Sequence, residues 1–264
     1  MDELKREFAD RDALVRYVTG LTPWLEAHSP SPIRGGAVAA QMKLDRIDPE
    51  RYGRTRNHLE GAVTGLSPYI RHGVLTLDRV RNEALRRTEK PARIEKFIQE
   101  LAWRDYWQRI YQRYPERIWQ DVEPYKTGYT AADYAVELPE DIALGETGVR
   151  CIDQFIGRLC STGYLHNHAR MYLAAYIVHW RRVRWQAGAR WFLHHLLDGD
   201  PASNNLSWQW VASTFSHKPY IFNLENVSKY ADAELDVSPA GNVVLDASYD
   251  ELQARLFPRL GRNT

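Results

Sequence analysis

The sequence predicts an all-α protein that forms one domain. Apolar residues recur at helical spacing along most of the 264-residue chain, whereas runs of β-branched residues are scarce. No glycine-rich phosphate loop follows an apolar strand, which argues against a nucleotide-binding α/β fold. We place the core of the domain, 1–264, at about residues 34–230 and expect residues 231–264 to form a loop-rich tail.

The individual helices are predicted from start signals and apolar stripes. Residues 2–20 have an amphipathic pattern, and the proline-rich stretch 22–35 indicates a loop. Ser67 and Pro68 mark a helix start, because serine suits the cap and proline the first turn. Further helices are expected at 37–44, 76–87, 92–114, 147–160, 164–182 and 188–197, a surface loop at 123–146, a turn at 198–207, a helix start at Trp208 and a last helix opening at Ser248.

Composition and charge exclude several classes of protein. The net charge of +1 produces no global field for nucleic acid, so a DNA-binding surface would have to be local. Two arginine clusters offer such patches, although a solvated helix face is the more common explanation of each: Arg51, Arg54 and Arg56, and Arg181, Arg182 and Arg184. Cys151 and Cys160 are too few for a four-thiolate cluster, and no metal site is predicted. Without a signal segment or a membrane span, we expect a reduced, cytoplasmic protein.

The predicted helix at 92–114 carries an unusual polar and aromatic stripe beside its apolar one. At 100° per residue the stripe contains Glu100, Trp103, Arg104, Trp107 and Tyr111. A solvated face seldom carries two tryptophans, and a core face seldom carries an unpaired charge. The stripe therefore indicates a binding site, unless Glu100 and Arg104 merely pair with each other on the surface at i,i+4 spacing.

The predicted helix at 164–182 has a similar mixed face. Asn167, Arg170 and Met171 share it with Ala174 and Val178, which describes a wall with hydrogen-bonding groups at one end and space at the other. The alternative is an ordinary packed helix in which Arg170 forms a salt bridge.

Polar residues are densest between Leu196 and Trp210. Asp198 and Asp200 precede several amides and two tryptophans, a pattern that suits hydrogen bonding to a ring system rich in N–H and C=O groups. A calcium loop is the alternative, but the glutamate expected at its twelfth position is replaced by Gln209.

Four segments together resemble motifs of the photolyase/cryptochrome family, in the family's order and at similar spacing. They are GLSPYIRHG at 65–73, ELAWRD at 100–105, TGYLHNHARM at 162–171 and DGDPASNNLSWQW at 198–210. The resemblance covers about residues 34–222 and is closest to the helical FAD-binding domain of cyclobutane pyrimidine dimer photolyases. It implies a helical bundle that holds a folded FAD.

The resemblance also implies which residues contact the cofactor. An anion favours a helix N-terminus, so the diphosphate is expected at the 64–67 stretch. Arg170 is expected to pair with Asp198, and Asn204 to face the flavin N5 atom. The full implied set is Tyr52, Thr64, Gly65, Leu66, Ser67, Arg104, Asn167, Arg170, Asp198, Asp200 and Asn204.

A substrate and a mechanism follow from the same resemblance. The implied reaction is carbon–carbon lysis by a deoxyribodipyrimidine photo-lyase, in which excited reduced FAD lends an electron to a dimer flipped out of UV-damaged DNA. The implied lesion contacts are Glu100, Trp103, Asn167, Met171 and Trp210, with the two tryptophans clamping the bases at the cavity mouth. Trp208 and Trp185 match an electron relay. The third relay position falls near Ala132, where Tyr129 or Tyr134 are the available aromatic residues.

Several departures from the family keep other functions open. Val63 and His168 replace residues expected to contact phosphate, and Leu224 replaces a proline. The family's N-terminal α/β domain has no counterpart in this sequence, so no antenna chromophore is expected on this chain. The alternatives are a cryptochrome-like photosensor or redox flavoprotein without repair activity, a subunit that docks with a separate antenna or signalling partner, and a helical protein without flavin.

Overall fold

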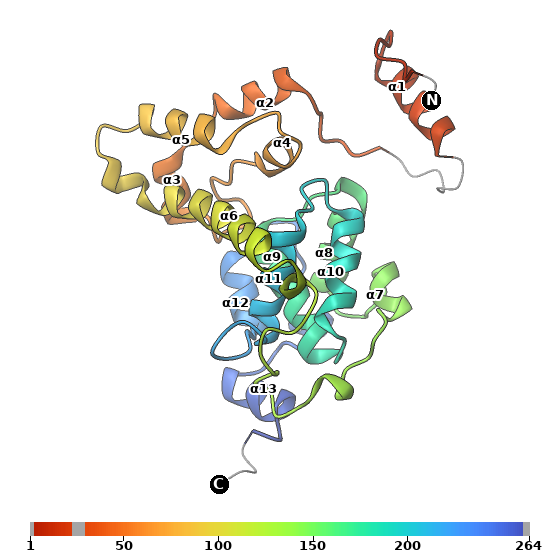
Figure 1. Ribbon diagram of the computed structural model, residues 1–264. Helices are drawn as coiled ribbons and strands as arrows, with labels where there is room; N and C mark the ends of the chain where they lie inside the picture. The colour runs from red at the N-terminus through yellow and green to blue at the C-terminus, as the bar shows by residue number, and fades with distance from the viewer. Residues whose placement is uncertain (1–2, 23–29, 261–264) are drawn as a thin grey trace. The chain divides into compact units, whose positions relative to one another are not determined.

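The computed structural model describes residues 3–22 and 30–260, and within them all regular structure is helical (Figure 1). The sole β-type pairing recorded among these residues is an isolated bridge between Ala135 and Val183. The all-α prediction is therefore confirmed. The chain divides into two compact units, Met1–Arg34 and Gly35–Thr264, and the units are described separately below.

The first unit contains helix α1 (Arg11–Leu21). The Asp10 side chain caps this helix by accepting a hydrogen bond of 2.7 Å from the Ala13 amide. The predicted start at residue 2 was wrong, because the aspartate cap stops the helix at its N-terminal side and residues 3–10 remain outside it. Part of the loop predicted at 22–35, residues 23–29, lies outside the described residues.

The second unit begins with helices that surround a small hydrophobic core. Its most buried members include Leu44, Leu66, Val80 and Ile94. The helices predicted at 37–44, 76–87 and 92–114 are confirmed, the last as a 3-10 turn followed by a long helix. The elements are α2 (Ala37–Leu44), α3 (Pro49–Thr55), α4 (Ser67–Arg71), α5 (Leu77–Arg86), η1 (Pro91–Ile94) and α6 (Glu95–Arg113).

A larger core is formed by the later helices, with Phe155, Tyr172, Trp185 and Phe192 among its fully buried side chains. No helix within residues 3–22 and 30–260 has the length and apolar character needed to cross a bilayer. The elements are η2 (Pro115–Ile118), η3 (Ala131–Asp133), α7 (Glu140–Leu144), α8 (Arg150–Thr162), α9 (Asn167–Ala175), the π-helical stretch η4 (Tyr176–Trp180), α10 (Trp185–His195), α11 (Pro201–Ala212), α12 (Leu224–Tyr230), η5 (Pro239–Gly241) and α13 (Tyr249–Leu256).

The turn predicted at 198–207 was wrong beyond its third residue. Asp200 caps helix α11, accepting a hydrogen bond of 2.9 Å from the Ser203 amide, and Pro201 occupies the first helical position. The helix therefore starts well before Trp208. This early start also excludes a calcium-binding loop of the EF-hand type, because most of the required loop is wound into α11.

Two further boundaries differ from the predictions. At α4 the cap position belongs to Leu66 and Ser67 is the first helical residue, so the serine side chain does not cap the helix. The stretch 123–146 is not loop throughout, because it contains η3 and α7. The start of the last helix at Ser248 is confirmed, with a reciprocal capping box between Ser248 and Glu251.

Helix α6 joins the two cores of the second unit, since it contacts α3 and α5 on one side and α11 on the other. Helix α11 in turn contacts α9 and α10. Figure 1 shows α6, in yellow, leading from the group of α2 to α5 towards α9 and α11. The polar faces of α6, α9 and α11 meet in the space between the two hydrophobic cores.

Candidate functional site

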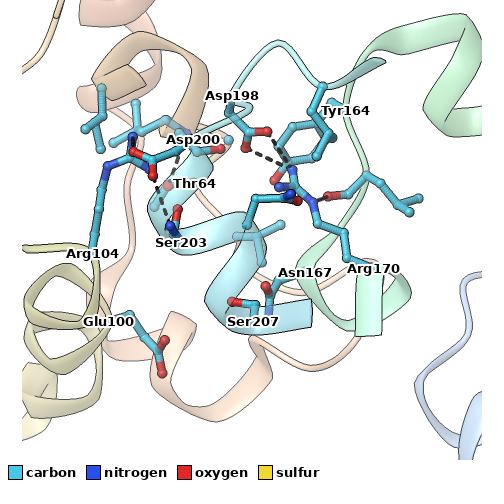
Figure 2. A pocket seen from close by; sticks show the side chains of 18 of the residues that line it. Thr64, Glu100, Arg104, Tyr164, Asn167, Arg170, Asp198, Asp200, Ser203 and Ser207 are labelled. Carbon is cyan, nitrogen blue, oxygen red and sulfur yellow. Dashed lines mark hydrogen bonds and ion pairs between the residues drawn. The ribbon is translucent and has the colours of Figure 1, made fainter. Parts of the chain in front are cut away.

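A cavity of about 300 Å³ lies between the two cores of the second unit. This volume is at the lower end of the range typical of ligand pockets, about 300–1,000 Å³. The wall is built from α3, the segment that enters α4, α6, α9 and the segment Leu196–Trp208, and Figure 2 shows their polar side chains converging. All eleven residues predicted to contact the cofactor line this cavity.

A buried ion pair joins two of the predicted residues. Arg170 Nη2 lies 3.0 Å from Asp198 Oδ1 and 2.9 Å from Oδ2, as the dashed lines of Figure 2 show, which confirms the expected pairing. Arg170 Nε donates to the Leu165 carbonyl oxygen at 2.7 Å, so two of the three guanidinium nitrogens are held by the protein. Burial acts to raise the pKa of Asp198, but the Arg170 guanidinium, hydrogen bonds from Arg170 and Ser67, and the charge of Arg104 hold that pKa below its usual range.

The second carboxylate of the motif connects α11 to α6. Asp200 lies 3.5 Å from Arg104 Nη2 and also accepts a hydrogen bond from the Gln108 amide. Because Asp200 also caps α11, one buried side chain sets the position of this helix and of the Arg104 guanidinium. The surface pair between Glu100 and Arg104 that the sequence left open is not formed.

The segment that enters α4 presents backbone to the cavity. Gly65 adopts a left-handed conformation with φ of 61°, which favours glycine. Thr64 Oγ1 accepts a hydrogen bond of 3.3 Å from the Leu66 amide and so holds the turn. Above this turn, the Lys43 ammonium would lie 3.1 Å from a Cβ atom added at Gly65.

Helix α11 forms one wall of the cavity with side chains spaced three and four residues apart. Asn204 Nδ2 donates to the Ala189 carbonyl oxygen at 3.1 Å and to Asn205 Oδ1 at 2.9 Å. Its amide hydrogens are thus used by the protein, and no described group donates to its Oδ1 atom. Trp208 is 2% exposed, and its indole N–H is buried without a partner among the described residues. The wall therefore offers the Asn204 Oδ1 atom as an acceptor for a ligand, while the Trp208 N–H is buried and presents no accessible surface to the cavity.

The opposite wall carries Glu100 and Tyr52. The Glu100 carboxylate lies 3.0 Å from Lys96 Nζ and 3.4 Å from Arg56 Nη1. Burial, assisted by the Glu100 charge, raises the pKa of Tyr52 to about 12, so its hydroxyl remains a donor at neutral pH. The Tyr52 ring meets Phe97 edge-to-face at 5.2 Å, which holds it against the small core.

The first turn of α9 completes the lining with two of the predicted lesion contacts. Asn167 Nδ2 lies 3.9 Å from Met171 Sδ, consistent with their i,i+4 spacing. Both residues line the cavity together with Glu100. Three of the five predicted lesion contacts therefore meet in one place.

The other two, Trp103 and Trp210, do not belong to the cavity lining. Trp103 is 48% exposed and stacks on Trp107 at 5.1 Å, while Trp210 is 42% exposed and packs against Tyr220. Each indole packs on a neighbouring aromatic ring at the surface, and the position of the two tryptophans at the cavity mouth stays a prediction. Among the predicted relay residues, Trp208 lines the cavity and Trp185 is fully buried behind it.

Sequence reasoning missed several lining residues. Arg56 was assigned to a charged cluster, and its place in the cavity follows only from the packing of α3 against α6. Ser203 and Ser207 lie one helical turn apart on α11, a signal hidden by the prediction of a turn there. Tyr164 stood inside a quoted motif without a role, and its ring lies 5.5 Å from the Arg170 guanidinium.

Comparison with known proteins identifies the family. The model of the FAD binding domain of DNA photolyase matches residues 97–237, which is more than half of the chain. The chain belongs to this photolyase family. Deoxyribodipyrimidine photo-lyases from Streptomyces griseus and Thermus thermophilus are 33% and 34% identical to it, over 72% and 69% of this chain. These matches cover 42% and 43% of the two relatives, so the chain spans less than half of their length.

Solved structures of the photolyase family resemble this fold. An archaeal photolyase from Sulfolobus tokodaii, described with two FAD molecules, superimposes with a TM-score of 0.63 at 30% identity, over 81% of this chain and 48% of that one. A cryptochrome from Synechocystis reaches a TM-score of 0.67 at 22% identity, over 79% of this chain and 47% of that one, and this likeness concerns the fold alone.

FAD is the cofactor of this family, and the lining of the cavity fits it. The Gly65 turn offers backbone amides without a Cβ atom in the way, which suits a phosphate. The Asn204 Oδ1 atom remains as an acceptor for the hydrogen-bonding edge of a flat ring system. The carboxylates and arginines between them supply partners for hydroxyl groups and phosphates.

Proposed function

We propose that this protein is a flavoprotein that repairs cyclobutane pyrimidine dimers in DNA with light. The observation that carries the proposal is the meeting, in one cavity, of all eleven predicted cofactor contacts and of Glu100, Asn167 and Met171. The chemistry that FAD supplies when bound is light-driven transfer of one electron. In the reaction the dimer accepts this electron, its two bridging carbon–carbon bonds break, and the electron returns, so that no net oxidation occurs.

The residues of this chain have separate tasks in that proposal. The backbone at Thr64–Ser67 would hold the diphosphate, with Arg104 and Tyr52 beside it. The pair formed by Arg170 and Asp198 would fix the polar edge of the flavin, because a charged pair already in place needs no reorganisation when the ligand binds. Asp200 would accept hydrogen bonds from ribose or ribityl hydroxyls.

Asn204 would help to decide which redox state of the bound flavin is stable. Its amide hydrogens are engaged by Ala189 and Asn205, so its free Oδ1 can only accept. An acceptor facing the flavin N5 atom favours a flavin that carries hydrogen at N5, which is the reduced state that repair requires.

Glu100 would contact the lesion. Its carboxylate can accept a hydrogen bond from an N–H group of the dimer, while Lys96 and Arg56 hold it in position. UV-damaged DNA is thus the proposed substrate. Binding would depend on local positive groups around the cavity, because the net charge of the chain is only +1.

One observation favours a second candidate, a cryptochrome-like photosensor or redox flavoprotein without repair activity. Trp103 and Trp210, which would have to stack on flipped bases, each already pack on a neighbouring ring, that of Trp107 and that of Tyr220. His168 stands where the family has an arginine, and it is buried against Tyr172 with its Nδ1 atom bonded to the Asn57 carbonyl oxygen at 2.8 Å. It therefore contributes no surface charge for a DNA strand.

A repair assay separates the two candidates. The FAD-loaded, chemically reduced protein is mixed with a UV-treated oligonucleotide, and dimers are counted after incubation in light and in the dark. Loss of dimers in light alone supports repair, with Glu100→Gln slowing it and leaving FAD bound. Asp105→Asn, on the same helix but exposed and paired with Arg109, is the matched control and should repair normally. Yellow protein without any light-dependent loss of dimers would favour the photosensor, and protein that cannot bind FAD would exclude both.

A further inference from the structure

Behind the cavity wall, two tryptophans stack in a line that leads to the surface. Trp185 is fully buried at the start of α10, and its ring lies parallel to that of Trp119, with 6.4 Å between centroids and 12° between planes. Trp119 follows η2 and is only half-buried, so its outer edge reaches solvent. Offset stacking at this separation is a favourable aromatic geometry.

The inner end of this line meets Trp208. A Cβ atom at Gly188 would lie 2.2 Å from the Cη2 atom of Trp208, so the Trp208 indole rests directly on the backbone of α10. Gly188 is three residues after Trp185 on the same helix, and residues at this spacing share a face. The Trp208 indole thus packs on the face of α10 that carries Trp185, and Trp185 in turn stacks on Trp119.

The carboxylate of Asp121 lies beside the buried Trp185 ring. Asp121 Oδ1 accepts a hydrogen bond of 2.6 Å from the Trp185 indole N–H and another of 3.1 Å from the Gln186 amide. Asp121 has no lysine or arginine within salt-bridge distance among the described residues. A carboxylate without a cation of its own stabilises positive charge on the group that donates to it.

Resting on the proposed function, we propose that Trp119 is the outer end of the electron path through Trp185 and Trp208, and that Asp121 stabilises positive charge on Trp185. The assignment departs from the expectation that the path ends near residue 132. When Trp208 loses one electron to the cofactor, Trp185 passes one electron to Trp208, and Trp119 passes one to Trp185. No bond forms or breaks in these steps. A thiolate in solution returns one electron to Trp119 and becomes a thiyl radical, and two such radicals combine into a disulfide.

The two tyrosines suggested by the sequence are poor ends for this path. The guanidinium groups of Arg182 and Arg259 lie over the Tyr129 ring, 3.5 and 4.2 Å from its centroid, and two cations oppose positive charge on the ring. Tyr134 is buried, and its hydroxyl meets the Thr127 hydroxyl at 2.9 Å. A tyrosine gives up an electron readily only together with its hydroxyl proton, and an alcohol is too weak a base to take it.

The exposed guanidinium of Arg190 lies over Trp119, 5.2 Å from the ring centroid, and allows an independent test. Its charge should make oxidation of Trp119 harder, by an amount that solvent screening reduces. Removing that charge should therefore act in the opposite direction to removing the charge of Asp121. A purely structural role of these residues would not produce such opposite effects.

The test uses the full chain loaded with oxidised FAD, with dithiothreitol as the thiol, under blue light. The rate of flavin reduction is followed by absorbance, and the tryptophan radical by transient absorption. Trp119→Phe should slow reduction and shorten the life of the radical by about tenfold, or about 1.4 kcal/mol. Asp121→Asn should slow the reduction of the flavin, and Arg190→Gln should speed it. Trp191→Phe, a half-buried tryptophan on α10 outside the line, is the control, together with Tyr129→Phe and Tyr134→Phe.

The proposal is overturned if Trp119→Phe behaves like Trp191→Phe, if one of the tyrosine variants shows the loss instead, or if Asp121→Asn and Arg190→Gln change the rate in the same direction. Repair by Trp119→Phe that has been reduced with dithionite should equal that of the unaltered protein, because this reductant bypasses the path. A failure of repair in the unaltered protein would refute the proposed function, while the photoreduction rates would still decide the role of Trp119.

Discussion

Arg170 reaches both carboxylate oxygens of Asp198 through one nitrogen, Nη2, at 3.0 and 2.9 Å. The side chain of Asp198 is 3% exposed and that of Arg170 23%, so the pair lies at the inner wall of the cavity. Such a pair positions a ligand more than it stabilises the fold, because desolvation offsets most of the attraction. Removing one partner, however, leaves a buried charge without compensation.

Arg170→Ala should therefore lower the free energy of unfolding of the apoprotein by about 3 kcal/mol, within the range for broken buried pairs. The measurement is urea denaturation followed by circular dichroism. The double variant Arg170→Ala with Asp198→Asn should recover part of the loss, since an amide is cheaper to bury than an unpaired carboxylate. Equal stability of the single and double variants would contradict the buried pair.

Stability should fall as the pH drops from about 6.5 to about 4. Burial is the main cause that lowers the pKa of His179 and that of His166 to about 4. The unfolded chain then takes up protons near pH 6.5 while the folded chain does not, so the stabilisation present above 6.5 is lost towards 4. Each histidine contributes a slope of up to about 1.4 kcal/mol per pH unit.

His179 offers a way to test that slope. Its Nε2 donates to the Val211 carbonyl oxygen at 2.9 Å, and its Nδ1 is buried without a partner, so a second proton would be unpaired in the core. His179→Gln keeps an N–H donor and cannot titrate. Unfolding free energies measured between pH 4 and 7 should show a shallower slope for this variant, and an unchanged slope would rule out the contribution of His179.

Because Gly188 contacts the Trp208 indole, we expect that α10 does not tolerate a side chain at position 188. A Cβ atom there would lie 2.2 Å from the indole, so Gly188→Ala should cost about 1–3 kcal/mol by overpacking and shift the Trp208 fluorescence. Gly157→Ala on α8 is the matched control, because nothing lies within 4 Å of its Cβ position. It should stabilise the protein by up to about 1 kcal/mol through helix propensity. Similar effects of the two changes would refute the close approach.

Alanine substitutions at Gly65 and Gly73 distinguish the effect of backbone strain from an effect on cofactor binding. Gly65 and Gly73 both have left-handed backbones, with φ of 61° and 71°, but only Gly65 lines the cavity. Each change to alanine should cost about 1–2 kcal/mol of stability. Gly65→Ala alone should also weaken FAD binding, measured by titration of the apoprotein with FAD and quenching of flavin fluorescence. Equal affinity in both variants would remove the Gly65 turn from the cofactor site.

Local sequence signals were sufficient for many elements of the fold. The helical spacing of α5 and α6, and the serine that opens α13, predicted those elements closely. Start signals failed at α11, where a cluster of turn-forming residues concealed an aspartate cap followed by proline at the first helical position. The same residues favour turns and helix caps, so their local pattern cannot distinguish the two.

The resemblance of four motifs to the photolyase/cryptochrome family was enough to name the residues that share a cavity, and helical spacing accounts for part of that set, because it puts Asn167 and Arg170 on one face of α9. The packing of the helices settled the rest: Trp103 stacks on Trp107 and is not part of the cavity lining, and Trp119 stacks on Trp185 with Asp121 at its edge. Trp119 and Trp185 are 66 positions apart along the chain. They meet because their elements pack against each other, and the sequence motifs do not describe that packing. Spacing along a helix is a property of the sequence, whereas contact between helices depends on how their surfaces interdigitate.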